Sequence, residues 1–210
     1  MNFGELQREV KTIVQDASPE ILVSIPDFIN EAYLQICEEV KPPSLKVLFS
    51  VPLSTSVAWT NMPNVFSGKL TYVGNSGGEI EILDNLEDLV KLYPTMTETG
   101  DVECVFLQGN VLWYQKIPTV ATSVICIGYN SPVVLLSEND EPSEIPTQLQ
   151  RGLLVNKAAA NAYNIIEDVS IDKDKVNAKL FAGLYEIEKM KMLNWVSSRR
   201  SNITTSCMRV

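Results

Sequence analysis

The apolar residues recur at helical spacing near both ends of the chain and at strand spacing in between. In residues 3–14 they lie three and four positions apart, as on one face of an amphipathic helix. A second stripe follows, and we expect its helix to begin near Ser24 and to end before Pro42. Two further stripes occupy residues 149–165 and 176–195. Because neither helix pair can bury its apolar face alone, the two pairs are predicted to pack together.

The two C-terminal helices are predicted from their own apolar stripes, which we expect to face the core. The third helix carries Leu149, Leu153, Leu154, Ala158, Ala162 and Ile165, and its small residues Ala158, Ala159 and Ala160 favour close helix approach. The last helix carries Val176, Leu180, Leu184, Ile187, Met190 and Trp195.

Between these helices the chain consists of short runs rich in β-branched and aromatic residues, separated by Gly, Asn and Pro. Gln108-Gly109-Asn110 joins two such runs and predicts an antiparallel hairpin. Glu79 and Glu81 alternate with isoleucines, which is typical of the solvent face of a strand. Residues 83–93 return to helical spacing and predict a helical insert.

The predicted fold class is therefore α+β, with a four-helix bundle built from the two ends of the chain and an inserted antiparallel β domain. The expected boundaries are 1–46 for the first half of the bundle, 47–136 for the β domain and 137–196 for the second half. Residues 197–210 are polar and lack helical patterning, so we expect a flexible C-terminal tail.

Charge is distributed unevenly along the chain, whose formal net charge is −9. Residues 1–45 hold three basic and eight acidic side chains, a net charge of −5, and residues 46–140 hold four and ten, a net charge of −6. Residues 141–210 hold ten and eight, a net charge of +2. The first two thirds should repel a nucleic-acid backbone, because binding to it depends on neutralised phosphates.

The residue types that most enzymes and metal sites need are scarce. The chain has no histidine, which removes the usual proton carrier near neutral pH and a common zinc ligand. Its four cysteines, Cys37, Cys104, Cys126 and Cys207, form no Cys-x-x-Cys pair, and we interpret them as reduced and mostly buried. We therefore expect no catalytic residue, no metal site and no bound cofactor. No apolar run is long enough to span a membrane.

The C-terminal tail is the best candidate for binding a partner. Flexible segments that mix basic and apolar side chains can become ordered on a sheet edge or in a groove of another subunit. The candidate binding residues are Arg199, Arg200, Ile203, Met208, Arg209 and Val210. A frayed terminus without function is the alternative interpretation.

Three segments, taken in order, resemble one protein family. Residues 28–36 read FINEAYLQI and resemble the "I-N-x-A-x-x-x-I" second helix of adaptor (head-tail connector) proteins from short-tailed bacteriophages. Residues 109–118 resemble the strand pair that leads to the "P-x-P" turn of that family, although Lys116 replaces its first proline. Residues 125–135 resemble the strand and exit that follow.

The resemblance implies a structural, non-enzymatic protein of the virion, located at the head-tail junction after assembly in the host cytoplasm. It implies a homo-oligomeric ring, usually of twelve copies, that binds the portal protein through its helices and C-terminal tail. The β domain would face the next tail component, a nozzle or a fibre, and double-stranded DNA would pass without specific binding. The alternative function is a tail-fibre or baseplate attachment protein whose β domain binds a ligand.

Overall fold

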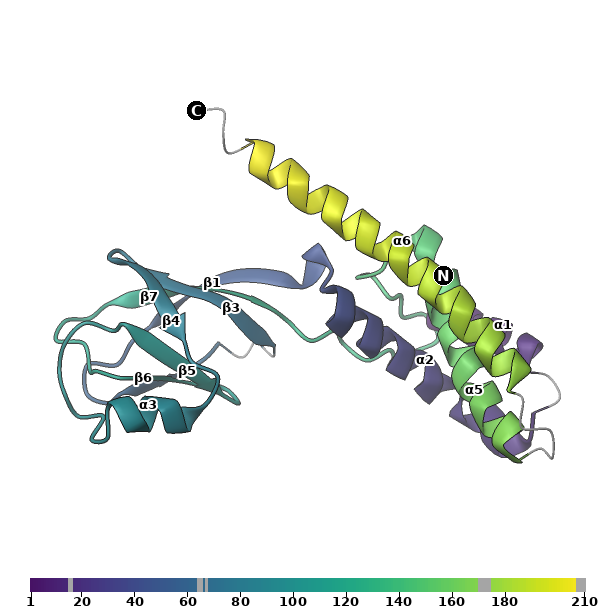
Figure 1. Ribbon diagram of the computed structural model, residues 1–210, viewed down its shortest axis with the longest axis horizontal. Helices are drawn as coiled ribbons and strands as arrows, with labels where there is room; N and C mark the ends of the chain where they lie inside the picture. The colour runs from purple at the N-terminus through teal and green to yellow at the C-terminus, as the bar shows by residue number, and fades with distance from the viewer. Residues whose placement is uncertain (15–16, 64–65, 67, 170–174, 207–210) are drawn as a thin grey trace. The chain divides into compact units, whose positions relative to one another are not determined.

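The computed structural model describes residues 1–14, 17–63, 66, 68–169 and 175–206 (Figure 1). The chain divides into two compact units. The first, which we call the helical unit, combines Met1–Ser44 with Pro132–Val210, and the second, the β unit, consists of Leu45–Ser131. The α+β class predicted from the sequence is confirmed.

The helical unit draws its helices from both ends of the chain. They are α1 (Phe3–Ile13), α2 (Pro19–Val40), α4 (Thr147–Gln150), the π-helical turn η2 (Arg151–Val155), α5 (Asn156–Val169) and α6 (Val176–Ser206). Helix α5 packs against both α2 and α6, and α1 packs against α2 and α5. Ala158, Ala159 and Ala160 are buried on α5 and permit this close packing, as the sequence predicted.

Helix α1 follows from local signals in the sequence. The side chain of Asn2 accepts a hydrogen bond from the Glu5 backbone N–H at 2.8 Å, and the Glu5 carboxylate accepts one from the Asn2 backbone N–H at 3.0 Å. This capping box satisfies two backbone donors that a helix start leaves unpaired. Phe3, Leu6 and Val10 are buried, so the predicted stripe is the core face.

Helix α2 begins earlier than predicted. Its N-terminal cap is Ser18 and its first residue is Pro19, so the expected start near Ser24 is wrong. Proline favours the first helical turn, where its missing N–H has no partner to lose. Pro26 lies inside the helix, and the neighbouring Ile25 and Ile29, both fully buried, hold this segment against the core although one backbone hydrogen bond is missing.

Asn30 of α2 fixes the segment through which the chain returns to the helical unit. Its amide Nδ2 donates to the Leu135 carbonyl at 3.0 Å, and its Oδ1 accepts from the Leu135 backbone N–H at 2.9 Å. Leu135 is buried, whereas Val134 and Leu136 on either side are exposed. The asparagine of the helix motif quoted above therefore has a structural role in this chain.

The β unit is one seven-stranded sheet in the order β1-β7-β3-β4-β5-β6-β2. Its elements are η1 (Pro43–Leu45) at the junction, β1 (Lys46–Pro52), β2 (Trp59–Asn61), β3 (Lys69–Asn75), β4 (Gly78–Ile82), α3 (Leu86–Leu92), β5 (Cys104–Gln108), β6 (Val111–Tyr114) and β7 (Ser123–Tyr129). The prediction of an antiparallel sheet is wrong for one pair, because β4 and β5 run parallel. Helix α3 lies in their connection and provides the crossover that a parallel pair requires (Figure 1).

Tyr114 organises the core of the β unit. The predicted hairpin places β5 antiparallel to β6, with Gly109 in the left-handed region (φ 58°) at the turn, and this buries Tyr114 completely. The Tyr114 hydroxyl accepts a hydrogen bond from the Ser54 backbone N–H at 2.8 Å and donates to the Val57 carbonyl at 2.9 Å. The loop between β1 and β2 is thereby tied to the sheet.

Candidate interaction surfaces

The buried thiols offer no activated nucleophile. Cys37, Cys104 and Cys126 are buried and form no disulfide. Burial raises the pKa of Cys37 to about 12 and the pKa values of Cys104 and Cys126 to about 11, with nearby Glu81 and Glu103 adding to the shift at Cys104. Because the thiolate is the reactive form, these three side chains are inert at neutral pH. Cys207 lies outside the described residues.

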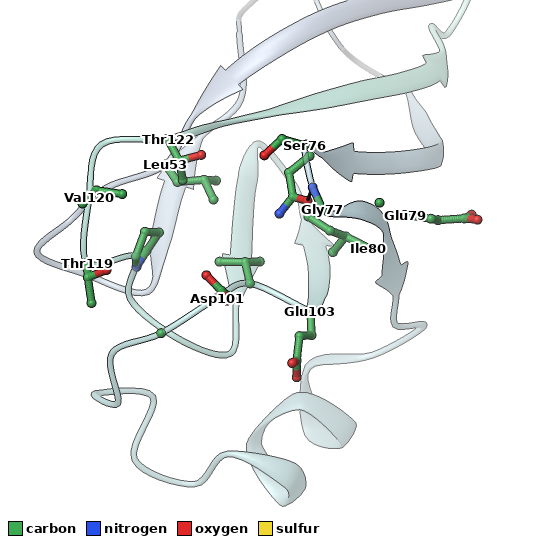
Figure 2. A pocket seen from close by; sticks show the side chains of 15 residues that line it. Leu53, Ser76, Gly77, Glu79, Ile80, Asp101, Glu103, Thr119, Val120 and Thr122 are labelled. Carbon is green, nitrogen blue, oxygen red and sulfur yellow. Dashed lines mark hydrogen bonds between the residues drawn. The ribbon is translucent and has the colours of Figure 1, made fainter.

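A cavity of about 520 Å³ lies in the β unit, between the β3–β4 turn and the loops that precede β5 and β7 (Figure 2). Glu79, Asp101 and Glu103 are at its border, but in Figure 2 the side chains of Glu79 and Glu103 point away from each other. Carboxylates that do not converge cannot share a proton or a cation. Among the described residues there is no cluster of three or more acidic or cysteine side chains able to hold a metal ion.

The predicted C-terminal tail is helical over most of its length. Helix α6 continues to Ser206, so the expected loss of helix at Ser197 is wrong for residues 197–206. Once a helix has formed, each added residue gains a hydrogen bond, and no glycine or proline interrupts this stretch. The guanidinium of Arg199 also lies 4.5 Å from the ring centre of Trp195, one turn earlier. Such a contact supports the last turns.

The six predicted binding residues therefore fall into two groups. Arg199, Arg200 and Ile203 belong to α6, and the exposed Arg199 is the one whose side chain the structure describes. The structure describes the backbone of Arg200 and Ile203 but not their side chains. Met208, Arg209 and Val210 are not among the described residues. The structure thus places half of this predicted site on a helix.

Helix α6 carries apolar side chains on two opposite faces, and the face predicted from the sequence to lie in the core is the wrong one. The buried face contains Ala178, Tyr185, Met192 and Val196. The predicted core stripe is largely exposed: its first five side chains, from 40% to 66% exposed, are Val176, Leu180, Leu184, Ile187 and Met190. We call these five residues the α6 ridge. The spacing of seven between Ala178, Tyr185 and Met192 is the sequence signal that indicates the buried face.

Contacts around Tyr185 explain why this face is inside. The amines of Lys157 and Lys189 each lie 5.4 Å from the centre of the Tyr185 ring. Lys189 also forms ion pairs with Glu39 of α2 at 3.2 Å and with Glu186 at 2.9 Å. Burial, followed by the nearby Glu39 carboxylate, raises the pKa of Tyr185 to about 12. These contacts join α6 to α2 and α5 and leave the ridge outside.

Lys189 also affects the titration of its partner on α2. Partial burial favours the neutral form of Glu39, but hydrogen bonds from Gln35 and Lys189 outweigh it and lower the pKa of this carboxyl. The same hydrogen bonds to Glu186 and Glu39, opposed by burial, raise the pKa of Lys189. The pair therefore favours the charged forms that join α6 to α2.

A second apolar surface of the helical unit is concave. A groove of about 480 Å³ lies between the start of α2 and the end of α5. We call it the α2/α5 groove, and its lining residues are Ala17, Ser18, Glu20, Ile21, Ser24, Phe28, Ile165 and Ile166. Ile165, which was predicted to face the core, is 45% exposed here. It lies close to the end of α5, where the core no longer covers it.

The length and hydropathy of the helices, and similarity to known families, bear on where such a chain works. No helix in the described part of the chain is both long and apolar enough to cross a membrane. Comparison with curated proteins finds no match. A family model described as SU10 adaptor protein matches residues 1–206. The resemblance to phage adaptor proteins inferred from the sequence is therefore confirmed over almost the whole chain.

Proposed function

Because the chain belongs to the SU10 adaptor protein family, we propose that it is a structural connector between the head and the tail of a tailed bacteriophage. The family indicates a virion component that associates with portal and tail components. The match over residues 1–206 carries this proposal, since it covers the helical unit and the β unit together and not one motif alone.

In this proposal several copies, usually twelve in such connectors, form a ring below the portal and extend the DNA channel. The charge distribution supports this role. The formal net charge is −9, and the acidic side chains are in excess in the first two thirds of the chain. An acidic channel wall repels phosphates, so that the duplex can slide through without binding.

The helical unit, arranged as a four-helix bundle, attaches to the portal, and the β unit faces the next tail component, a nozzle or a fibre. The C-terminal end of α6 and the residues after it supply the portal contact through Arg199, Arg200, Ile203, Met208, Arg209 and Val210. Two features support this assignment. The C-terminal third is the one stretch with net positive charge, and Arg199 is exposed on α6, where its guanidinium lies 4.5 Å from the ring centre of Trp195.

Mass measurement of the protein, alone and after addition of the portal protein, tests the connector role. We expect a complex of defined stoichiometry with the portal. Arg199→Glu/Arg200→Glu should weaken this complex, whereas the charge-matched control Lys69→Glu/Lys91→Glu in the β unit should not. Unchanged portal binding by the arginine variant would show that Arg199 and Arg200 do not contribute to the interface. Absence of any portal complex for the wild-type protein would overturn the connector function.

The cavity in the β unit provides a test of the alternative function. A tail-fibre or baseplate attachment protein would bind a ligand through this unit without assembling on a portal. Binding of a bacterial surface glycan in the cavity of about 520 Å³, together with failure to form a ring, would favour that alternative. Ring formation without glycan binding would favour the connector.

A further inference from the structure

The α6 ridge needs a partner that the isolated chain does not supply. A helix with apolar side chains all round is typical of a buried helix. In this chain one face of α6 is buried by α5 and α2, while the opposite face exposes five large apolar side chains over four turns. Scattered exposed apolar residues are ordinary, but a continuous stripe of this kind marks an interaction site.

The same helical unit carries a surface that can receive such a ridge. The α2/α5 groove is concave and apolar at its centre, where Ile21, Phe28 and Ile166 are half-buried and Ile165 is exposed. Packing side-chain ridges of one helix into the groove beside another is the general way in which helices associate. A convex and a concave apolar surface are therefore present on one chain.

The unpaired charges beside the two surfaces differ in sign. Lys179, Glu186 and Lys191 are exposed beside the ridge; ion pairs join Glu186 to Lys189 and Lys191 to Glu188, so within the described part of the chain Lys179 is the charge left outside an ion pair there. Glu20 lines the groove, and the exposed Asp27 lies two turns further along the same face of α2. Complementary charges of this kind select a partner and fix its register.

We infer that the α6 ridge of one copy of this chain docks into the α2/α5 groove of the next copy. This inference rests on the proposed ring and names the surfaces that hold it together. A closed ring requires a heterologous interface, in which two different surfaces of each subunit meet. Because every copy has one ridge and one groove, the contact repeats from subunit to subunit until the ring closes.

Two variants test the two surfaces of this interface one at a time. Leu180→Glu/Ile187→Glu places two carboxylates on the ridge, where the wild-type side chains are 55% and 56% exposed, so the fold should tolerate them. Ile165→Glu places one carboxylate in the groove, which Glu20 also lines. Leu48→Glu is the matched control, because Leu48 is an exposed apolar residue of the β unit, at 72%. Circular dichroism and thermal melting verify the fold of each variant.

Sedimentation velocity over a concentration series, and native mass spectrometry with the portal protein present, measure assembly. We expect the ridge variant and the groove variant each to self-associate at least about 100-fold more weakly than the wild type. At the highest concentrations of the series, where one such contact suffices for a pair, an equimolar mixture of the two should give heterodimers that do not grow, because the ridge variant retains its groove and the groove variant retains its ridge. The control should assemble like the wild type.

Each other outcome overturns the inference in a recognisable way. Wild-type assembly by both variants would show that the ring uses other surfaces, while the connector function stands. Assembly by the groove variant alone, with no heterodimer in the mixture, would show that the ridge contacts another ridge or the portal protein. If the wild-type chain forms no multimer either alone or on the portal, the proposed function fails as well.

Discussion

Replacing Asn30 by alanine should destabilise the helical unit by about 2–4 kcal/mol. The Asn30 side chain forms both hydrogen bonds of the Leu135 backbone, at 3.0 Å and 2.9 Å. Leu135 is 4% exposed, so water cannot easily replace the lost partner. An unpaired buried donor or acceptor costs about 1–3 kcal/mol, so two such groups cost about 2–6 kcal/mol. Because the Asn30 contact is only partly buried, the lower part of this interval is expected.

Thermal unfolding followed by circular dichroism at a helix-sensitive wavelength measures this loss. For a chain of this size 1 kcal/mol corresponds to about 2–4 °C in Tm, so Asn30→Ala should lower the helical transition by roughly 4–16 °C. Asn30→Asp keeps the acceptor for the Leu135 N–H but loses the donor, and an intermediate decrease is expected. Because the β unit lacks this contact, its own transition should move less.

Asn161→Ala is the matched control. Asn161 is also a helical asparagine and its amide donates to Glu31 at 3.0 Å, but this contact is exposed. Both variants replace a helical asparagine by alanine, so the change in helix propensity is the same. Asn161→Ala should therefore change the free energy of unfolding by less than about 0.5 kcal/mol. Equal melting temperatures for Asn30→Ala and Asn161→Ala would refute the role assigned to the Asn30–Leu135 contact.

Three further predictions concern the core and its titration. Met192→Ala should lower the free energy of unfolding by about 2–5 kcal/mol because Met192 is fully buried, whereas Met190→Ala, on the ridge, should lower it little. Equal losses of stability for the two variants in urea unfolding would contradict the assigned faces of α6. Tyr114→Phe should cost about 1–3 kcal/mol, since the Ser54 N–H and the Val57 carbonyl lose their hydroxyl partner, and chemical denaturation measures it. The lowered pKa of Glu39 contributes stability that is present above its unfolded pKa and lost as the pH falls below about 4.3. In Lys189→Gln the melting temperature should therefore fall less between neutral and acidic pH than in the wild type. The same fall in both proteins would contradict this prediction.

Local signals predicted the elements that local forces determine. The Asn2–Glu5 capping box and the apolar stripe of α1, and the Gly109 turn of the β5–β6 hairpin, are encoded within a few residues. Each feature fixes its own backbone geometry regardless of what packs against it. For such elements the sequence pattern was sufficient.

The errors concern features that depend on distant partners. Ser24 followed by Pro26 has the composition of a helix start, but packing of Ile25 and Ile29 carries α2 through this point. The parallel pairing of β4 with β5 depends on how the chain crosses over through α3, and a period-two pattern is the same for both directions. Neither outcome could be derived from spacing alone.

Helix α6 shows why one chain can lack the information needed to assign its own core. Two apolar faces satisfy the helical period equally, and the face that stays exposed carries more of the large aliphatic side chains. The choice is made by contacts of Tyr185 and Lys189 with α2 and α5, which no local pattern contains. An apolar stripe that stays exposed in the isolated chain is expected when a second subunit buries it during assembly.

The energetics of the ridge favour a closed ring over an isolated pair of subunits. Completing the burial of five half-exposed side chains contributes about 1 kcal/mol each, or roughly 5 kcal/mol for one ridge. Association of two proteins costs an estimated 4–15 kcal/mol in lost freedom, so a single ridge–groove contact gives at best a weak pair. The copy that closes a ring gains two such contacts for one loss of freedom. Assembly should therefore depend steeply on concentration, with monomers and complete rings dominating over open intermediates, and a portal that holds several copies in place should lower the concentration required.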